Sequence, residues 1–142
     1  MGGRGTVVLV VEADAEERER LGSLLEEGRM EVLACPGPTG PDYVCFAGRG
    51  QPCPLVGVAD VVVLDLWLES YTVMAGTSAE ELLAHYLSSG KRVVTLGRRG
   101  ASLEPYPAEE VVGLTRYPGR EELIGAVRRV RTQGPGFAKG NL

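Results

Sequence analysis

The chain has 142 residues, of which 44% are hydrophobic and 24% are charged, so we expect one globular domain whose core needs no disulfide bonds. Its 20 glycines and 9 prolines exclude a continuous helical bundle, and no apolar run reaches the ~20 residues that a membrane-spanning helix needs. The net charge of -4 is uneven, because residues 1–90 carry 5 Lys/Arg against 14 Asp/Glu whereas residues 91–142 carry 10 against 5. The simplest explanation of the basic residues in 91–142 is a solvated helix face. The alternative, functional explanation is a surface that attracts an acidic protein rather than nucleic acid or a membrane.

Five short apolar runs predict strands that are buried on both faces, as in a parallel sheet. They cover residues 6–11, 30–34, 59–68, 92–96 and 111–115. The first run, TVVLVV, and the third, ADVVVLDLWL, are rich in β-branched residues and lack the polar alternation of a strand with one solvated face.

Three amphipathic helices are predicted between or after these strands. The first is capped by Asp14 and ends at Gly28, the second covers residues 78–89, and the third covers residues 121–131. Buried strands that alternate with helices imply a doubly wound α/β fold with a five-stranded parallel sheet.

Two segments interrupt the alternation. Glycine and proline make up 10 of the 22 residues from 36 to 57, which predicts an irregular loop over residues 35–58 in place of a helix. Residues 97–110 allow at most one helical turn, so a helix there is short or absent. We therefore expect a single domain over residues 1–132, followed by a flexible tail over residues 133–142.

Three acidic residues follow the ends of predicted strands. Glu12 and Asp14 come after the first strand, and Asp65 closes the third. If these strands are neighbours, the carboxylates converge at one edge of the sheet, where a cation such as Mg²⁺ would neutralise them. A solvated first helical turn explains Glu12 and Asp14 equally well, but it does not explain an aspartate within VVVLDLWL.

Three segments together resemble the receiver domain of bacterial response regulators, the CheY-like superfamily. They are VVLVVEADAEERERLGSLLEEG, ADVVVLDLWLES and GLTRYPGREELIGAVRRV, and the resemblance spans about residues 6–131. It implies a flavodoxin-like strand order of 2-1-3-4-5, with the second helix of the family replaced by the Gly/Pro/Cys-rich loop.

The resemblance also implies roles for individual residues. Asp65 takes the position of the aspartate that accepts a phosphoryl group from a histidine kinase, and Glu12 takes the first position of the acidic pair that holds Mg²⁺. The backbone carbonyl of Trp67 takes the position of a further metal ligand, and Asp14 adjoins the pair.

Three positions depart from the family pattern. Ala13 stands where the second acid belongs, and Gly97 stands where a Ser or Thr hydroxyl follows the fourth strand, unless a shorter strand brings Thr95 there. Arg116 replaces the lysine after the fifth strand, and a planar guanidinium does not reproduce an ammonium group. These departures weaken the expected Mg²⁺ site and the phosphorylation chemistry.

The cysteines form no familiar metal-binding pattern. Cys35, Cys45 and Cys53 are spaced by ten and eight residues, which does not match a zinc knuckle. The simplest explanation of the three cysteines is that their thiols are buried or idle. The functional explanation is that they form a thiol site in the irregular loop.

We expect an atypical receiver domain of bacterial signal transduction, located in the cytoplasm. It is not an enzyme and acts alone by binding another protein, either a histidine kinase or a downstream regulator, with weak or no phosphorylation of Asp65. The last helix also offers a face for a homodimer. Two alternatives stay open, namely an active Mg²⁺-dependent phosphoacceptor and a small-ligand or metal-binding module built on the cysteine-rich loop.

Overall fold

The computed structural model describes residues 5–35, 53–66, 79–97 and 110–132. The predicted tail, most of the irregular loop, Cys45, Trp67 and the segment expected to lack a full helix therefore lie outside the described residues. Within the described ranges, no helix combines the length and the apolar character required to cross a membrane.

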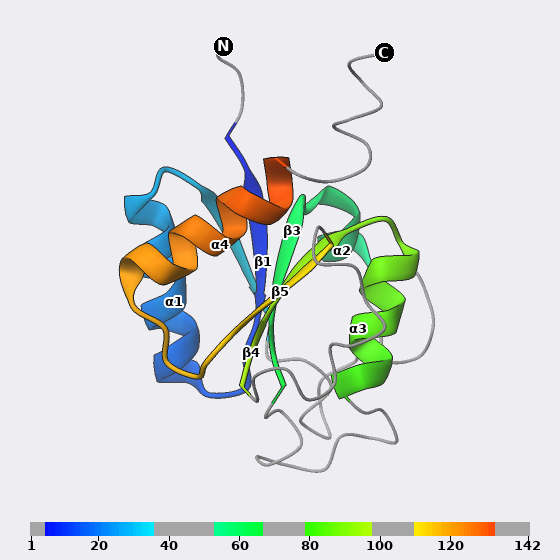
Figure 1. The fold of residues 1–142 in the computed structure, drawn as a ribbon, viewed down its shortest axis with the longest axis horizontal. Coiled ribbons are helices and arrows are strands. Elements are labelled where there is room, and N and C mark those ends of the chain that lie inside the picture. The colour runs from blue at the N-terminus through cyan, green and yellow to red at the C-terminus, as the bar shows by residue number, and fades with distance from the viewer. Residues whose placement is uncertain (1–4, 36–52, 67–78, 98–109, 133–142) are drawn as a thin grey trace.

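Five parallel strands form one sheet in the order β2-β1-β3-β4-β5, which confirms the predicted flavodoxin-like fold. They are β1 (Val7–Val11), β2 (Glu31–Cys35), β3 (Val61–Asp65), β4 (Arg92–Leu96) and β5 (Val111–Leu114). Every residue of β1 and β3 is buried, as their unbroken apolar sequences predict. The carboxyl ends of the strands meet at the lower edge of the sheet in Figure 1.

Helices cover both faces of the sheet (Figure 1). On one face, α1 (Ala15–Glu27) and α4 (Arg120–Thr132) bury Leu21, Leu25, Leu123 and Val127 against the strands. On the other face, α2 (Pro54–Val58) and α3 (Ala79–Ser88) bury a second apolar cluster that contains Val56, Leu82, Leu83 and Tyr86. This doubly wound arrangement leaves the carboxyl edge of the sheet to the connecting segments.

The start of α1 follows the predicted capping arrangement. Asp14 lies in an extended conformation, and its Oδ1 accepts hydrogen bonds from the backbone N–H groups of Glu16 at 2.9 Å and Glu17 at 3.2 Å. The helix ends at Gly28, also as predicted, and Arg29 follows with a left-handed φ of 66°.

Two predicted boundaries are wrong. Residues 54–58 form the short helix α2 inside the segment expected to be irregular, because Pro54 has a φ suited to the first helical position and Val56 is buried in the core. The third strand begins at Val61 instead of residue 59. Ala59 caps α2, and Asp60 turns its carboxylate to the backbone N–H of Val7 at 2.8 Å.

We predict opposite effects for alanine at two glycines near the contact between α1 and α4. A Cβ at Gly28 would lie 2.9 Å from Cδ1 and 3.1 Å from Cγ1 of the buried Ile124, so Gly28→Ala should destabilise the fold by about 1 kcal/mol. A Cβ at the exposed helical residue Gly125 meets nothing within 4 Å, so Gly125→Ala should stabilise it by about 1 kcal/mol. Urea unfolding of both variants measures these changes, and equal effects would contradict the tight contact.

Candidate functional site

The pairing of β1 with β3 brings two carboxyl groups together at the carboxyl edge of the sheet. Val11 is in register with Leu64, so Glu12 and Asp65 come next on neighbouring strands. Glu12 is held there by a hydrogen bond of 3.0 Å from its backbone N–H to the carbonyl of Cys35. The two residues are only 2% and 1% exposed, respectively. The predicted convergence of these two acids is therefore present in the structure.

Burial determines the protonation of this pair. Burial is the largest factor that raises the pKa of Glu12, to about 8, and a hydrogen bond with Asp65 and repulsion from it raise the pKa further. The backbone N–H of Asp14, 3.1 Å from Oε2 of Glu12, and the charge of Arg116 oppose the shift. The raised pKa of Glu12 favours its protonated form at neutral pH, and the hydrogen bond between Glu12 and Asp65 requires a proton on one of the two carboxyl groups.

Arg116, at the carboxyl end of β5, supplies a positive charge to the pair. Its Nη2 lies 3.7 Å from Oδ2 of Asp65, and its side chain is 24% exposed. The guanidinium also lies over the ring of Tyr117, 5.0 Å from the ring centre. The structure thus brings together Glu12, Asp65 and Arg116, three of the residues that the sequence marked.

The sequence did not reveal how the segment after Arg116 is held. Tyr117 has a left-handed φ of 58°, which is uncommon for a residue other than glycine. Its side chain is 59% exposed, which is high for a large hydrophobic residue. Arg20 of α1 donates from Nη2 to the carbonyl of Pro118 at 3.0 Å, and it also forms an ion pair with Glu17 at 2.7 Å. The sequence carried no signal for a contact between residues 98 positions apart.

Asp14 does not join the buried pair, because its Oδ1 caps α1. Arg18, in the first turns of α1, donates a hydrogen bond of 2.7 Å to the backbone carbonyl of Glu12. Among the residues that the structure describes, no group of three or more His, Cys, Asp or Glu side chains is placed to hold a metal ion. The described donors to Mg²⁺ are thus Glu12 and Asp65 alone, and Glu12 would first have to lose its proton.

The residue after β4 is Gly97, as the sequence alignment implied. Its φ of 133° favours glycine, and its N–H donates to the carbonyl of Leu114 at 3.0 Å. Thr95 lies within the strand and is buried, in register with Leu64 and Gly113. The position beyond the strand therefore carries no hydroxyl group.

Two of the three cysteines lie in the described residues, and they form no disulfide bond with each other. Cys35 is buried at the end of β2, and Cys53 precedes α2 and packs against the same apolar cluster. A core position agrees with the simplest explanation of these thiols.

Comparison with known proteins shows similarity of fold rather than of sequence. No model of a protein family matches the sequence, and no curated protein matches it. The structure matches the receiver domain of the Francisella response regulator 1452, with a TM-score of 0.62 and 17% identity over 91% of this chain and 98% of that one. It also matches a CheY-like receiver domain from Methanospirillum hungatei, with a TM-score of 0.59 and 21% identity over 95% and 98% of the two chains.

A third match is the response regulator TrrA from Thermotoga maritima, solved in complex with Mg²⁺ and BeF, with a TM-score of 0.61 and 17% identity over 88% of this chain and 98% of that one. These matches cover almost the whole of each receiver domain. The chain therefore has the receiver-domain fold.

We predict that Glu12 makes folding stability fall with rising pH. Between pH 4.5 and about 8, the folded chain keeps a proton on Glu12 that the unfolded chain has released, so stability is lost across this window and levels off above it. Glu12→Gln, which mimics the protonated side chain, should remove this dependence and be more stable than the wild type by a few kcal/mol at pH 8–9.

Thermal unfolding of both proteins from pH 5 to pH 9 measures the effect. Glu16→Gln on the exposed side of α1 serves as the control and should follow the wild-type curve. Parallel curves for wild type and Glu12→Gln would show that Glu12 has no shared proton.

Proposed function

We propose that this chain is an atypical receiver domain of bacterial two-component signalling, which binds a protein partner without needing phosphorylation at Asp65. The observation that carries the proposal is the closed state of the site. The carboxyl group of Asp65 is 1% exposed, hydrogen-bonded with a protonated Glu12 and next to Arg116. Arg116 thus offsets part of the charge of Asp65, although the buried Oδ2 of Asp65 accepts no hydrogen bond.

Phosphoryl transfer to Asp65 would have to overcome this arrangement. An attacking carboxylate needs access to the phosphorus atom and a nearby cation that stabilises the charge on the transferred group. Here a Mg²⁺ ion would have to displace the proton of Glu12 with one acidic ligand fewer, because Ala13 supplies none. Loss of a single well-placed electrostatic group commonly lowers a rate by ~10²–10³, so we expect phosphorylation to be very slow.

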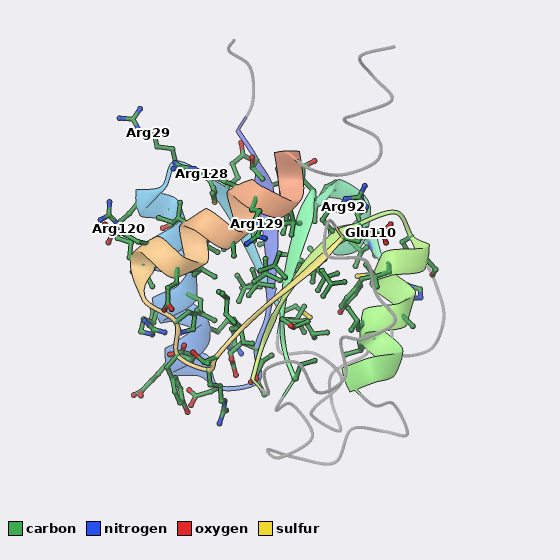
Figure 2. All side chains as sticks on the ribbon, in the orientation of Figure 1. Arg29, Arg92, Glu110, Arg120, Arg128 and Arg129 are labelled. Carbon is green, nitrogen blue, oxygen red and sulfur yellow. The ribbon has the colours of Figure 1, made fainter. Side chains whose placement is uncertain are left out.

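The partner would be recognised by the basic face of α4. Arg120, Arg128 and Arg129 are exposed along this helix, and Arg29 is exposed at the turn after α1 (Figure 2). Glu27 pairs with Arg120 at 3.0 Å and compensates part of this charge. An acidic surface on another protein complements the face, whereas two copies of it would repel each other. We therefore favour an acidic partner, such as a kinase or a downstream regulator, over a homodimer.

A second candidate function is that of an active phosphoacceptor. The observation that favours it is the presence of an aspartate, a second acid and a cation in one pocket. For this function, Glu12 and Asp65 would hold Mg²⁺, which would draw charge away from the incoming phosphoryl group. The proton on Glu12 and the single remaining acid of the pair weigh against it.

We predict that the wild-type protein forms only a small fraction of phosphate adduct when incubated with acetyl phosphate and Mg²⁺, as measured by intact mass. Ala13→Asp should raise the initial rate of adduct formation at least ~10-fold, because it adds a charged ligand next to Glu12. Ala13→Asn, which has the same shape without the charge, is the matched control.

Asp65→Asn added to Ala13→Asp should abolish the adduct and identify the modified residue. A stoichiometric adduct on the wild type that is lost in Asp65→Asn would contradict the proposal and support the active phosphoacceptor.

A further inference from the structure

The strand β2 forms one edge of the sheet, and its outer backbone groups can be identified from its register. The N–H of Glu31 donates to the carbonyl of Thr6, and the carbonyl of Cys35 accepts from the N–H of Glu12. Because the backbone groups of a strand point to alternate sides, those of Val32 and Ala34 point away from β1. Within the part of the chain that the structure describes, no strand pairs with this edge.

A groove runs along this edge, between β2 and α1. Its volume is about 580 Å³, and Val32 and Ala34 line it from the strand side. Gly22 lines it from α1, and a Cβ there would meet Cγ1 of Val32 at 3.4 Å. Helix α1 thus lies against the strand at ordinary van der Waals distance here, while Ala34 further along the strand is exposed.

The rim of the groove is acidic. Glu19 and Glu26 line it from α1, and both are exposed. Glu31, at the start of the strand, is exposed as well. Arg18 also lines the groove, but its Nη1 donates to the carbonyls of Glu12 at 2.7 Å and Ala13 at 3.4 Å, which directs its charge toward the end of β1. The groove therefore presents two exposed carboxylates on its α1 side, with a third at the start of the strand.

We propose that this groove binds an extended, basic segment of a partner protein, which adds to the sheet as a further strand beside β2. Main-chain hydrogen bonds to the N–H and C=O groups of Val32 and Ala34 would hold the segment at strand spacing. Side chains on alternate positions of the added strand fall on the α1 side of the sheet, where lysine or arginine meets Glu19 and Glu26.

The same charges argue against a second copy of this chain as the occupant. Pairing of β2 with the β2 strand of another copy would bring the acidic rims of both together, which repels them. The proposed segment is also distinct from the acidic partner of α4, because it requires the opposite charge and lies along α1. The groove thus extends the proposed function by a second binding surface.

The experiment uses a short acetylated peptide of alternating lysine and valine, titrated into isotopically labelled full-length protein. We expect saturable binding with a dissociation constant of ~10⁻⁵–10⁻⁴ M, since the interface is small. Amide shifts in the NMR spectrum should center on β2 and the groove side of α1, and hydrogen exchange at Val32 and Ala34 should slow.

Two variants test the two parts of the proposal. Ala34→Pro removes an outward N–H and should weaken binding at least ~10-fold, as should a peptide that is N-methylated on its pairing edge. Glu19→Lys/Glu26→Lys should weaken binding of the lysine peptide to a similar extent and permit binding of a glutamate–valine peptide. Glu16→Lys/Glu121→Lys, with the same change in net charge at exposed positions outside the groove, should bind like the wild type.

Three results would overturn the proposal. They are no binding at millimolar peptide, binding that N-methylation leaves unchanged, and equal loss in the charge control. The last two would indicate nonspecific attraction. Because Ala34→Pro can disturb the fold, its circular dichroism is compared with that of the wild type, and the N-methylated peptide gives the same test on an unaltered protein. Phosphodonor treatment does not enter this experiment, so its outcome is independent of that at Asp65.

Discussion

Two carboxyl groups that are buried at the ends of neighbouring strands need a proton or a cation to compensate their charge. The arrangement of the strand ends and of Arg116 follows from this constraint. The register of β1 and β3 places Glu12 beside Asp65, and the surrounding residues exclude water from both. With Ala13 in place of a second acid, the described residues form no group of three or more His, Cys, Asp or Glu side chains placed to hold a metal ion. Arg116 then supplies a fixed positive charge in the same pocket. The charge of Asp65 is thus offset in part by Arg116, while its buried Oδ2 accepts no hydrogen bond.

Under the proposed function, this partial compensation of charge would distinguish the site from a metal-dependent site on the same fold. A pocket with surplus negative charge attracts a cation and, through it, an anionic substrate, whereas a neutralised pocket attracts neither strongly. Under the proposed function, the fold would serve to present binding surfaces. Helix α1, which lines the acidic groove along β2, and the basic helix α4 pack together on the same face of the sheet, so the two proposed surfaces are neighbours.

The sequence predicted the features that depend on local pattern. The apolar runs placed all five strands, Asp14 was predicted to cap α1, and the aspartate within VVVLDLWL indicated a special site. The short helix α2 was not predicted, because five residues within a segment rich in glycine and proline show no helical periodicity. The proton on Glu12 and the bond from Arg20 to Pro118 depend on which strands and loops become neighbours in space. A linear pattern carries no signal for such contacts.

The backbone conformation at position 117 and the contact of its side chain with Arg116 favour different residues. A left-handed φ is adopted most easily by glycine or asparagine and costs a bulky side chain on the order of 1 kcal/mol. The contact with the guanidinium of Arg116 needs an aromatic ring. Glycine would relax the backbone here but would leave Arg116 without this support. Tyr117 therefore combines an unfavourable backbone conformation with an aromatic contact to the charge of Arg116, so relieving the backbone and keeping the contact cannot both be achieved by one residue at this position.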